Sequence, residues 1–472
     1  MVQKAILLLP ELVQLSLILL LFMQTLKIPA TDKSLTGWLP YFAGFGVVVA
    51  AFSLHTQGLL FFEAYRVDPI SQFFKTCVAL GFFIAVLNAS PLPMVNPEKQ
   101  ADYFLFMALS AFGLMLLASS VELITIFVAL EISSYSLYAL IPLRGNDPRA
   151  AEAGIKYILF GAAATALALF GLSYILTAQH TTYLAVLAVK SWAWKDATLA
   201  VVGLTLFMVG FFYKLALFPF HFWCPDVYDG TCNETAAYAA TLPKLGAAVI
   251  LIRLTALMKP DLEIATLFAV LGAFSMTFGN LAALIQKDVK RMLGYSSVAH
   301  AGYLMVGLSA ISAAGLAAAG FYSLIYILMN LTCFWVICRL STDGRNIELD
   351  DLNGLHERAP ALAFTLAVGA FALVGLPPTA GFMGKLFLLT AAWNRGHNWL
   401  VILAALNTAI SIYYYLNLVR HAYTREAETI FPALRPYSAV WGGVLATLIL
   451  LLGAIPGPVF SLVENASRSL MP

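Results

Sequence analysis

The sequence predicts an all-α polytopic membrane protein of about 14 transmembrane helices, with two inverted five-helix repeats and with breaks in helices 7 and 12. Of its 472 residues, 61% are hydrophobic and 11% are charged, whereas soluble domains carry about 25% charged residues. The second reason is a series of apolar runs long enough to cross a bilayer. The third is a frame of residues that occurs twice, each time around a lysine.

The apolar runs begin near residues 4, 38, 70, 102, 121, 150, 198, 235, 262, 292, 314, 360, 398 and 437. Each approaches the roughly 20 residues that a helix needs to cross the hydrocarbon layer. The first run, from Ala5 to about Leu26, lacks a small-residue cleavage site, so we expect a retained helix rather than a signal peptide. The connections are short, and none can bury a soluble core.

We expect four parts along the chain. Residues 1–101 hold helices 1 to 3, and residues 102–258 form the first inverted half with helices 4 to 8. Residues 259–425 form the second inverted half with helices 9 to 13, and residues 426–472 hold helix 14.

Lysine and arginine in the short loops predict the orientation, because cytoplasmic loops are enriched in them. One side collects Lys27, Lys33, Lys99, Arg144, Arg149, Lys287, Lys290, Arg291, Arg339, Arg345, Arg358, Arg420, Arg425 and Arg435. The other side has Lys4, Arg66, Lys75, Lys190, Lys195, Lys259, Arg395 and Arg468. We therefore expect the first side to be cytoplasmic and both termini to be non-cytoplasmic, in a bacterial-type inner membrane, with an organellar membrane as the alternative.

The repeated frame reads "GFFYKLALF" around Lys214 and "GFMGKLFLL" around Lys385. Lys214 falls in the seventh expected span and Lys385 in the twelfth, so an odd number of crossings separates them. The two frames then run through the membrane in opposite directions, which is the layout of an inverted repeat. Coincidence among common Gly, Phe and Leu residues is the alternative interpretation.

Prolines punctuate each copy of the frame. Pro219 and Pro225 follow the first lysine, and Pro377, Pro378 and Gly381 precede the second. Irregular backbone at membrane depth persists only where protein or trapped water satisfies the freed amide groups. Each break therefore predicts a hydrated cavity.

Five charged residues fall inside apolar runs: Glu131, Lys156, Lys214, Lys244 and Lys385. A charge at the centre of a transmembrane helix costs about 2.5–3.5 kcal/mol on insertion scales, so these side chains should face the protein interior. Buried lysines in series can gain and lose protons near neutral pH, which favours a proton relay. The alternative is that each lysine reaches an interface or makes a fixed ion pair. That alternative has most weight for Lys156, which is near its helix start.

Three further residues support the relay hypothesis. Glu152 lies one turn before Lys156 on the same helix face. His221 and His300 are of the type that titrates near neutrality, and they have hydroxyl neighbours such as Tyr228 and Ser297 in the sequence. For each histidine, a neutral ring held by a packing hydrogen bond is an equal alternative.

With these residues in place, the sequence resembles the family of antiporter-like N subunits of respiratory complex I, also called subunit 2 of NADH dehydrogenase. The resemblance covers nearly the whole chain and includes "LEISSYSLYAL", "EAGIKYILFGA", "YKLALFPFHFWCPDVYDG", "NLAALIQKDVKRMLGYSSVAHAGYLMVGL", "LDDLNGLHERAP", "LVGLPPTAGFMGKLFLL" and "ISIYYYLNLV". It implies a fourteen-helix subunit in which protons move through Glu131, Lys156, Lys214, Lys244 and Lys385, with His300 between the halves.

The resemblance also implies partners. The chain has no redox-cofactor motif and no metal site is expected in it, so NADH, FMN, Fe-S clusters and quinone are expected on partner subunits of a complex I-type assembly. The other expected surroundings are membrane subunits and the lipid bilayer. A net charge of +2 gives no reason to expect a nucleic-acid partner.

One segment departs from the family pattern. Family members usually follow the aspartate-valine-tyrosine with a glycine-alanine-proline-threonine-proline run, whereas this chain reads "DGTCNETAAY". Both prolines are lost, and Glu234 adds a carboxylate about three turns before Lys244. We expect the local water geometry to differ from the family's.

Other functions stay open at this point. A subunit of a multi-subunit sodium/proton antiporter would share the buried lysines and the inverted halves. His221 and Asp226 form H-x-x-x-x-D, a spacing found in some membrane acyltransferases, but the sequence has no companion motif for acyl or phosphate binding. Cys224 and Cys232 could form a disulfide or, with His221, an incomplete metal site; two unpaired thiols are the favoured expectation.

Overall fold

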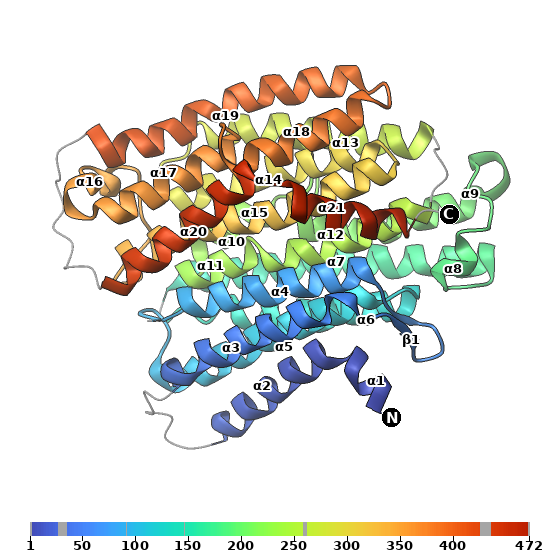
Figure 1. Cartoon of the computed structure of the whole chain (residues 1–472), viewed down its shortest axis with the longest axis horizontal. Coiled ribbons are helices and arrows are strands. Elements are labelled where there is room, and N and C mark those ends of the chain that lie inside the picture. The colour runs from blue at the N-terminus through green and yellow to red at the C-terminus, as the bar shows by residue number, and fades with distance from the viewer. Residues whose placement is uncertain are drawn as a thin grey trace.

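The computed structural model describes residues 2–26, 35–90, 92–145, 147–257, 262–424 and 436–470, and the statements below concern these residues. Long helices lie side by side with their axes roughly parallel (Figure 1). In chain order they are α1 (Val2–Leu7), α2 (Leu9–Thr25), α3 (Leu35–Phe52), α4 (Pro69–Asn88), α5 (Gln100–Ser119), α6 (Leu123–Leu140), α7 (Pro148–Gln179), α8 (Leu184–Leu187), α9 (Trp194–Leu215), α10 (Trp223–Gly230), α11 (Asn233–Ala239), α12 (Leu242–Leu257), α13 (Leu262–Ala283), α14 (Val289–Ser309), α15 (Ala313–Leu340), α16 (Leu355–Arg358), α17 (Pro360–Val374), α18 (Ala380–Trp393), α19 (Asn398–Thr424), α20 (Pro436–Ala454) and α21 (Gly457–Arg468).

Three short 3₁₀ turns and one hairpin complete the described chain. The turns are η1 (Ser53–His55), η2 (Pro97–Lys99) and η3 (Asp350–Leu352), and the hairpin pairs β1 (Gly58–Leu60) with β2 (Tyr65–Val67). The strands are antiparallel, with Leu59 opposite Arg66. The hairpin lies at one end of the bundle, between α3 and α4.

Eleven helices in the described ranges are long and apolar enough to cross a membrane. The shorter apolar helices α2, α17 and α18 and the more polar 21-residue α14 add to them. The sequence run that begins near residue 360 is divided into α17 and α18, and the seventh run is divided into α9 and α10. The predicted all-α membrane fold is confirmed, while the count of fourteen spans stays a prediction.

Two helical segments form the centre of the bundle. In the most apolar window of α15, every residue is buried, and the span Asn233–Leu257, which contains α11 and α12, is 94% buried. Alanine and glycine at the start of α15 let neighbouring helices approach closely. These two segments therefore provide the frame against which the broken helices pack.

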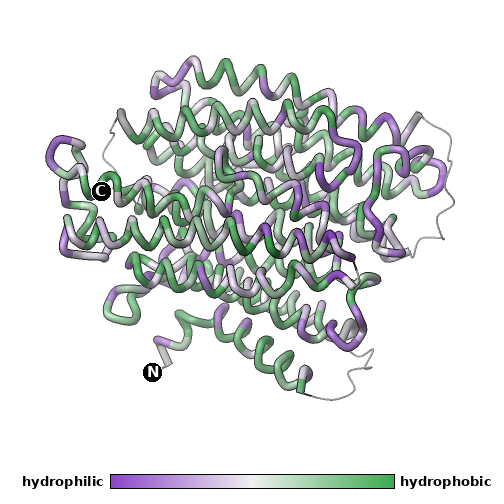
Figure 2. The backbone as a smooth tube through the Cα atoms, turned by 180° about the vertical axis from the view of Figure 1, so that it is seen from behind, coloured by the Kyte–Doolittle hydropathy of each residue, from purple (hydrophilic) through white to green (hydrophobic). Residues whose placement is uncertain are grey.

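The first and last described residues lie at the same end of the bundle (Figure 1). Hydrophobic residues follow the helices, and hydrophilic stretches gather at the two ends (Figure 2). The domain boundaries expected at residues 259 and 426 fall outside the described residues, as do Lys27, Lys33, Lys259, Arg425 and Arg435.

Four cations that we expected in loops are buried: Lys75, Arg144, Lys290 and Arg339. The loop position is wrong for Lys75, Lys290 and Arg339, which lie in α4, α14 and α15, whereas Arg144 lies in the connection between α6 and α7. All four are buried because each of them finds an oxygen partner inside the bundle. Arg144 and Lys290 donate to carbonyl groups at the end of α10, and Arg339 donates to the carbonyls of Leu87 and Ser90. Lys75 contacts a buried carboxylate.

A buried ion pair ties α12 to the hairpin end of α4. Asp68 caps the N-terminus of α4, and its two oxygens accept hydrogen bonds from Arg253 at 2.8 and 2.9 Å. Burial by itself works to raise the pKa of Asp68, but the Arg253 guanidinium and the Ser71 groups hold this pKa below its ordinary value. The pair therefore stabilises the fold whenever Asp68 is ionised.

Replacing Asp68 with Asn should lower the unfolding free energy by about 3–5 kcal/mol, because Arg253 would keep a buried and unmatched charge. Thermal unfolding of the detergent-solubilised protein at neutral pH measures this loss. Because the folded pKa of Asp68 is depressed, its contribution is present above the unfolded value of about 3.9 and is lost as pH falls through the folded value. The two proteins should therefore converge in strongly acidic buffer. The exposed pair Arg468–Glu464 supplies a control, because Glu464→Gln should change stability by less than about 1 kcal/mol.

Candidate functional site

Lys214 lies at the first helix break. It occupies the last turn of α9, and Ala216 ends the helix with a left-handed backbone conformation, φ 59°. The chain then runs irregularly past Pro219 to α10. The Lys214 side chain is 3% exposed, and its Nζ donates to the Tyr157 hydroxyl at 3.1 Å. The C-terminal end of a helix carries a partial negative charge, which favours a cation there.

Lys385 lies at the second break, in the helix that follows it. α17 ends at Gly375, whose φ of 87° suits glycine, and a side chain there would meet the aliphatic part of Lys385. Lys385 Nζ donates to the carbonyls of Leu373 and Val374 at 3.1 and 2.9 Å. These two carbonyls belong to the last turn of α17, so a lysine caps the broken end of the helix.

Lys244 gives the first break the same kind of cap. From α12, its Nζ donates to the Leu215 carbonyl, the last of α9, at 2.7 Å. It also donates to the Ser297 hydroxyl of α14. At both breaks, a buried lysine thus binds the last carbonyl groups of the helix before the break. At the first break this lysine comes from α12, and at the second it comes from α18, the helix that follows the break.

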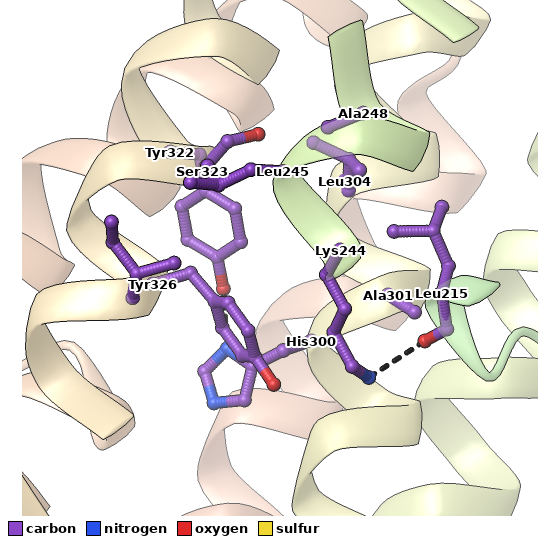
Figure 3. A pocket seen from close by; sticks show the side chains of 11 residues that line it. Leu215, Lys244, Leu245, Ala248, His300, Ala301, Leu304, Tyr322, Ser323 and Tyr326 are labelled. Carbon is purple, nitrogen blue, oxygen red and sulfur yellow. Dashed lines mark hydrogen bonds between the residues drawn. The ribbon is translucent and has the colours of Figure 1, made fainter. Parts of the chain in front are cut away.

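A small cavity lies beside Lys244 and His300 (Figure 3). Its volume is about 20 Å³, enough for about one water molecule. Tyr322 and Tyr326 of α15 line it together with Leu215, and Figure 3 shows Lys244 reaching the Leu215 carbonyl from one side. The surface that lines this cavity is almost entirely apolar, because the polar atoms of Lys244 and His300 are directed to their hydrogen-bond partners.

Hydroxyl groups next to this cavity connect Lys244 and His300 to further polar side chains. Ser297 lies 2.6 Å from the Tyr326 hydroxyl, so Lys244 reaches Tyr326 through a single hydroxyl. His300 Nδ1 lies 2.6 Å from the Tyr322 hydroxyl, and its Nε2 lies 3.3 Å from that of Tyr415.

The charges that act on His300 are those of Lys385 and Lys244. Lys385 Nζ lies 4.3 Å from the centroid of the Tyr303 ring, and that ring is 6.0 Å from the His300 ring. His300 is therefore placed between the two lysines that hold the broken helix ends.

Glu131 projects from α6 and is 7% exposed. Its Oε1 accepts a hydrogen bond from Thr165 of α7 at 3.0 Å, and no cation in the described ranges lies within ion-pair distance of it. Glu131 is nevertheless the charged group that acts on Lys214. The structure thus holds this carboxylate and this lysine apart, with the Tyr157 hydroxyl bound to the lysine.

Lys156 differs from the other four charges. Its side chain is 36% exposed, and its Nζ contacts Asp226 at 2.6 Å and Glu152 at 2.7 Å. Asp226 also contacts Arg291 at 2.7 Å. This arrangement is the fixed ion pair that the sequence left open as an alternative, and its location near the start of α7 explains the exposure.

Substituting Lys156 with Met should reduce proton translocation less than substituting Lys214 does. Asp226 would keep Arg291, and a pair this exposed contributes only about 0–1 kcal/mol to stability. Parallel assays of donor-driven acidification in proteoliposomes and of thermal unfolding test this order. A loss of proton translocation as severe as that in the Lys214 variant would show that Lys156 belongs to the relay.

His221 lies in the first break and is 1% exposed. Its ring packs against Phe218, Phe222 and Phe278 at centroid distances of 5.4, 4.5 and 4.6 Å, and Nδ1 has no hydrogen-bond partner among the described residues. Its sequence neighbour Tyr228 instead lies 3.3 Å from Ser297, on the Lys244 side of the site. The structure therefore does not bring His221 to the line of hydroxyls.

The two cysteines of interest are buried free thiols. Cys224 donates to the Gly294 carbonyl at 3.5 Å and Cys232 to the Leu143 carbonyl at 3.7 Å. Within the described ranges, no group of three or more His, Cys, Asp or Glu side chains could hold a metal ion.

Glu234 is 3% exposed in α11. The cations that act on it are Lys290, Arg339 and Arg144, which also bind the carbonyls described above. The carboxylate that distinguishes this chain from the family pattern therefore lies within reach of their charges, but among the described residues no ion pair joins it to them. Sequence reasoning missed this arrangement, because all three cations were expected in loops.

Comparison with known proteins agrees with this geometry. Residues 119–411 match the family described as "NADH:quinone oxidoreductase/Mrp antiporter, TM". The chain is 61% identical to NADH-quinone oxidoreductase subunit N 2 of Solidesulfovibrio magneticus, over 98% of this chain and 99% of that protein. It is 33% identical to F(420)H(2) dehydrogenase subunit N of Methanosarcina mazei, over 100% of both.

Solved structures show the same fold. A chain of respiratory complex I from Thermus thermophilus with bound aureothin gives a TM-score of 0.84 at 32% identity, over 96% of this chain and 98% of that chain. A chain of the Mrp complex from Dietzia sp. DQ12-45-1b gives a TM-score of 0.88 at 19% identity, over 100% of this chain and 98% of that chain, and this likeness concerns the fold alone. The chain belongs to the family of membrane subunits shared by NADH:quinone oxidoreductases and Mrp antiporters.

Proposed function

We propose that this chain is an antiporter-like N subunit of a complex I-type oxidoreductase and moves protons across the membrane while partner subunits carry out electron transfer to quinone. The observation that carries the proposal is the pair of helix breaks, each with its terminal carbonyls held by a buried lysine. The carbonyl groups at a helix end offset part of the cost of a buried charge, so a lysine there can hold a proton and pass it to a neighbouring hydroxyl or water.

The relay runs from Glu131 and Lys214 through Lys244 and His300 to Lys385. Lys244, Ser297 and Tyr326 are joined by hydrogen bonds, and the Tyr326 ring lies 5.4 Å from the His300 ring, beside the small cavity. Lys156 and Glu152 act at the edge, where the ion pair of Lys156 with Asp226 positions α7 against α10 and Glu152 contacts the same lysine. His221 has a packing role in this scheme.

The two inverted halves are residues 102–258 and 259–425. In this scheme α6 corresponds to α14, so Glu131 in the first half and His300 in the second occupy equivalent helices. The side that holds the α10–α11 connection is cytoplasmic, and both termini are non-cytoplasmic. NADH or F(420)H(2) as the donor, with flavin and Fe-S clusters, belongs to partner subunits, in keeping with the names of the two relatives.

The purified complex in liposomes tests the function directly. Oxidation of the donor should change the pH of the liposome lumen, in a direction set by the orientation of the complex, and a pH-sensitive dye reports this change. The rate of the change should not depend on the sodium concentration. The second candidate is a sodium/proton antiporter subunit, which the family description favours because it includes the Mrp antiporter. Donor-independent exchange of sodium for protons would support that candidate and reject the first.

A further inference from the structure

A second buried charge cluster lies outside the relay, where α2, α4 and the β1–β2 hairpin meet. Glu11 Oε1 contacts Lys75 Nζ at 2.5 Å and accepts a hydrogen bond from the Tyr65 hydroxyl at 2.5 Å. Glu11 and Tyr65 are each 3% exposed, and Lys75 is 0% exposed. Within the described ranges, this is the one lysine–carboxylate ion pair with both side chains buried.

The cluster leaves hydrogen-bonding capacity unused. Both donors contact the same carboxylate oxygen, while Glu11 Oε2 is buried without a partner among the described residues. Lys75 carries three N–H donors, but its Nζ has no well-aligned hydrogen bond there. An ion pair that served only to join two helices would be expected to satisfy these groups, since unsatisfied buried polar groups are costly.

The end of the bundle nearest to the cluster contains cavities, although Glu11, Tyr65 and Lys75 do not line them. Two cavities of about 400 and 410 Å³ share Leu59 and Arg66 of the hairpin, next to Tyr65. Arg253 lines the first cavity and Asp68 the second, so their ion pair lies between the two. Lys75 is seven residues beyond Asp68 along α4, which corresponds to about 10 Å.

The groups that face the pair come from several elements. The groups that act on Lys75 are Glu11 from α2, Asp68 from the N-cap of α4 and Arg253 from α12. Asp68 and Arg253 compensate each other in their bidentate pair. From the hairpin only Tyr65 faces the pair, and from the end of α5 the uncharged Ser119 faces Tyr65.

We propose that Glu11, held between Lys75 and Tyr65 with one carboxylate oxygen unpartnered, is a second proton-exchange site near the hairpin end of the bundle. A hydronium ion transfers its proton to Glu11 Oε2, a new O–H bond forms, and water remains. Oε1 keeps both of its contacts in either state, so the site can exchange a proton without separating α2 from α4. On release the same O–H bond breaks and water takes the proton.

Infrared difference spectroscopy of the purified complex between two pH values tests the site without any pumping measurement. The wild type should show a carboxylic acid C=O band that is absent in Glu11→Gln and shifted in Tyr65→Phe, because Tyr65 donates to the same carboxyl group. If Glu11→Gln does not assemble, Tyr65→Phe alone decides. Carboxyl bands that are identical in wild type and Tyr65→Phe would overturn the proposal, whatever the fate of the relay.

Proton translocation by the complex distinguishes exchange from simple anchoring. The double variant Glu11→Gln with Lys75→Met removes both charges together and so avoids leaving one of them unpaired. If the pair exchanges protons, translocation should fall about a hundredfold or more, as expected for loss of an acid–base group. Normal translocation in an assembled double variant would show that the pair only anchors. Gln14→Met is the matched control, because Gln14 anchors α2 to the Ala108 carbonyl without a titratable group.

Discussion

Replacing Lys214 with Met should stop proton translocation while the complex still assembles. The side chain lies at the end of α9, where its only hydrogen bond among the described residues goes to the Tyr157 hydroxyl. Met fills a similar volume without a charge, so the packing around the break should persist. Loss of an acid–base group typically costs at least about a hundredfold in rate. Donor-driven acidification in proteoliposomes should fall to near background, and coupled electron transfer should fall with it.

Two further variants are needed to interpret this result. Lys190→Met removes an exposed lysine and should leave translocation unchanged. Glu131→Gln keeps the hydrogen bond from Thr165 but removes the charge that acts on Lys214, so it should resemble the Lys214 variant. Full translocation in Lys214→Met would reject the role of this lysine. An unaltered ratio of protons to electrons in Glu131→Gln would make Glu131 structural.

The sequence was sufficient to find the central charges, because a charged residue within an apolar run is conspicuous. Lys214, Lys244 and Lys385 are all buried, and prolines between α9 and α10 and between α17 and α18 marked both breaks correctly. The length of the apolar runs likewise predicted the membrane fold. A transmembrane helix satisfies its own backbone, so its length and polarity are determined locally.

The groups that connect these charges could not be predicted in the same way. Tyr322, Tyr326 and Tyr415 are three of 20 tyrosines, and nothing in their local sequence indicates which of them face His300. The capping carbonyls of Leu215 and Val374 are backbone atoms, which every residue has. Their role depends on where a helix ends relative to a lysine on another segment.

Misplaced cations had a related cause. Lys75 lies close to the beginning of an apolar run and was therefore expected in a loop. Its ion pair with Glu11 forms only when α2 packs on α4. Lys156 shows the opposite case. Its location near the start of a helix indicated that a fixed ion pair was possible, but its partner Asp226 is 70 residues away in the sequence and could not be named from it.

Lys385 provides the sharpest distinction between a fixed charge and a relay. Its Nζ holds the carbonyls of Leu373 and Val374, so a cation is needed to cap α17 whether or not a proton ever leaves. Lys385→Arg keeps this cation but cannot release its proton, because arginine stays charged. Lys385→Glu keeps an ionisable group but places a negative charge against the negative end of the helix, which is unfavourable.

If Lys385 passes protons, both variants should lose nearly all donor-driven acidification, and they should differ in stability. The arginine variant should unfold at nearly the wild-type temperature, whereas the glutamate variant should be less stable, because the last turn of α17 would lose its cap. Proteoliposome acidification and thermal unfolding of the same preparations provide both readouts. Normal pumping by Lys385→Arg would show that only a fixed positive charge is required at this break. The proton would then have to leave the line at His300 or at one of the tyrosine hydroxyls next to it.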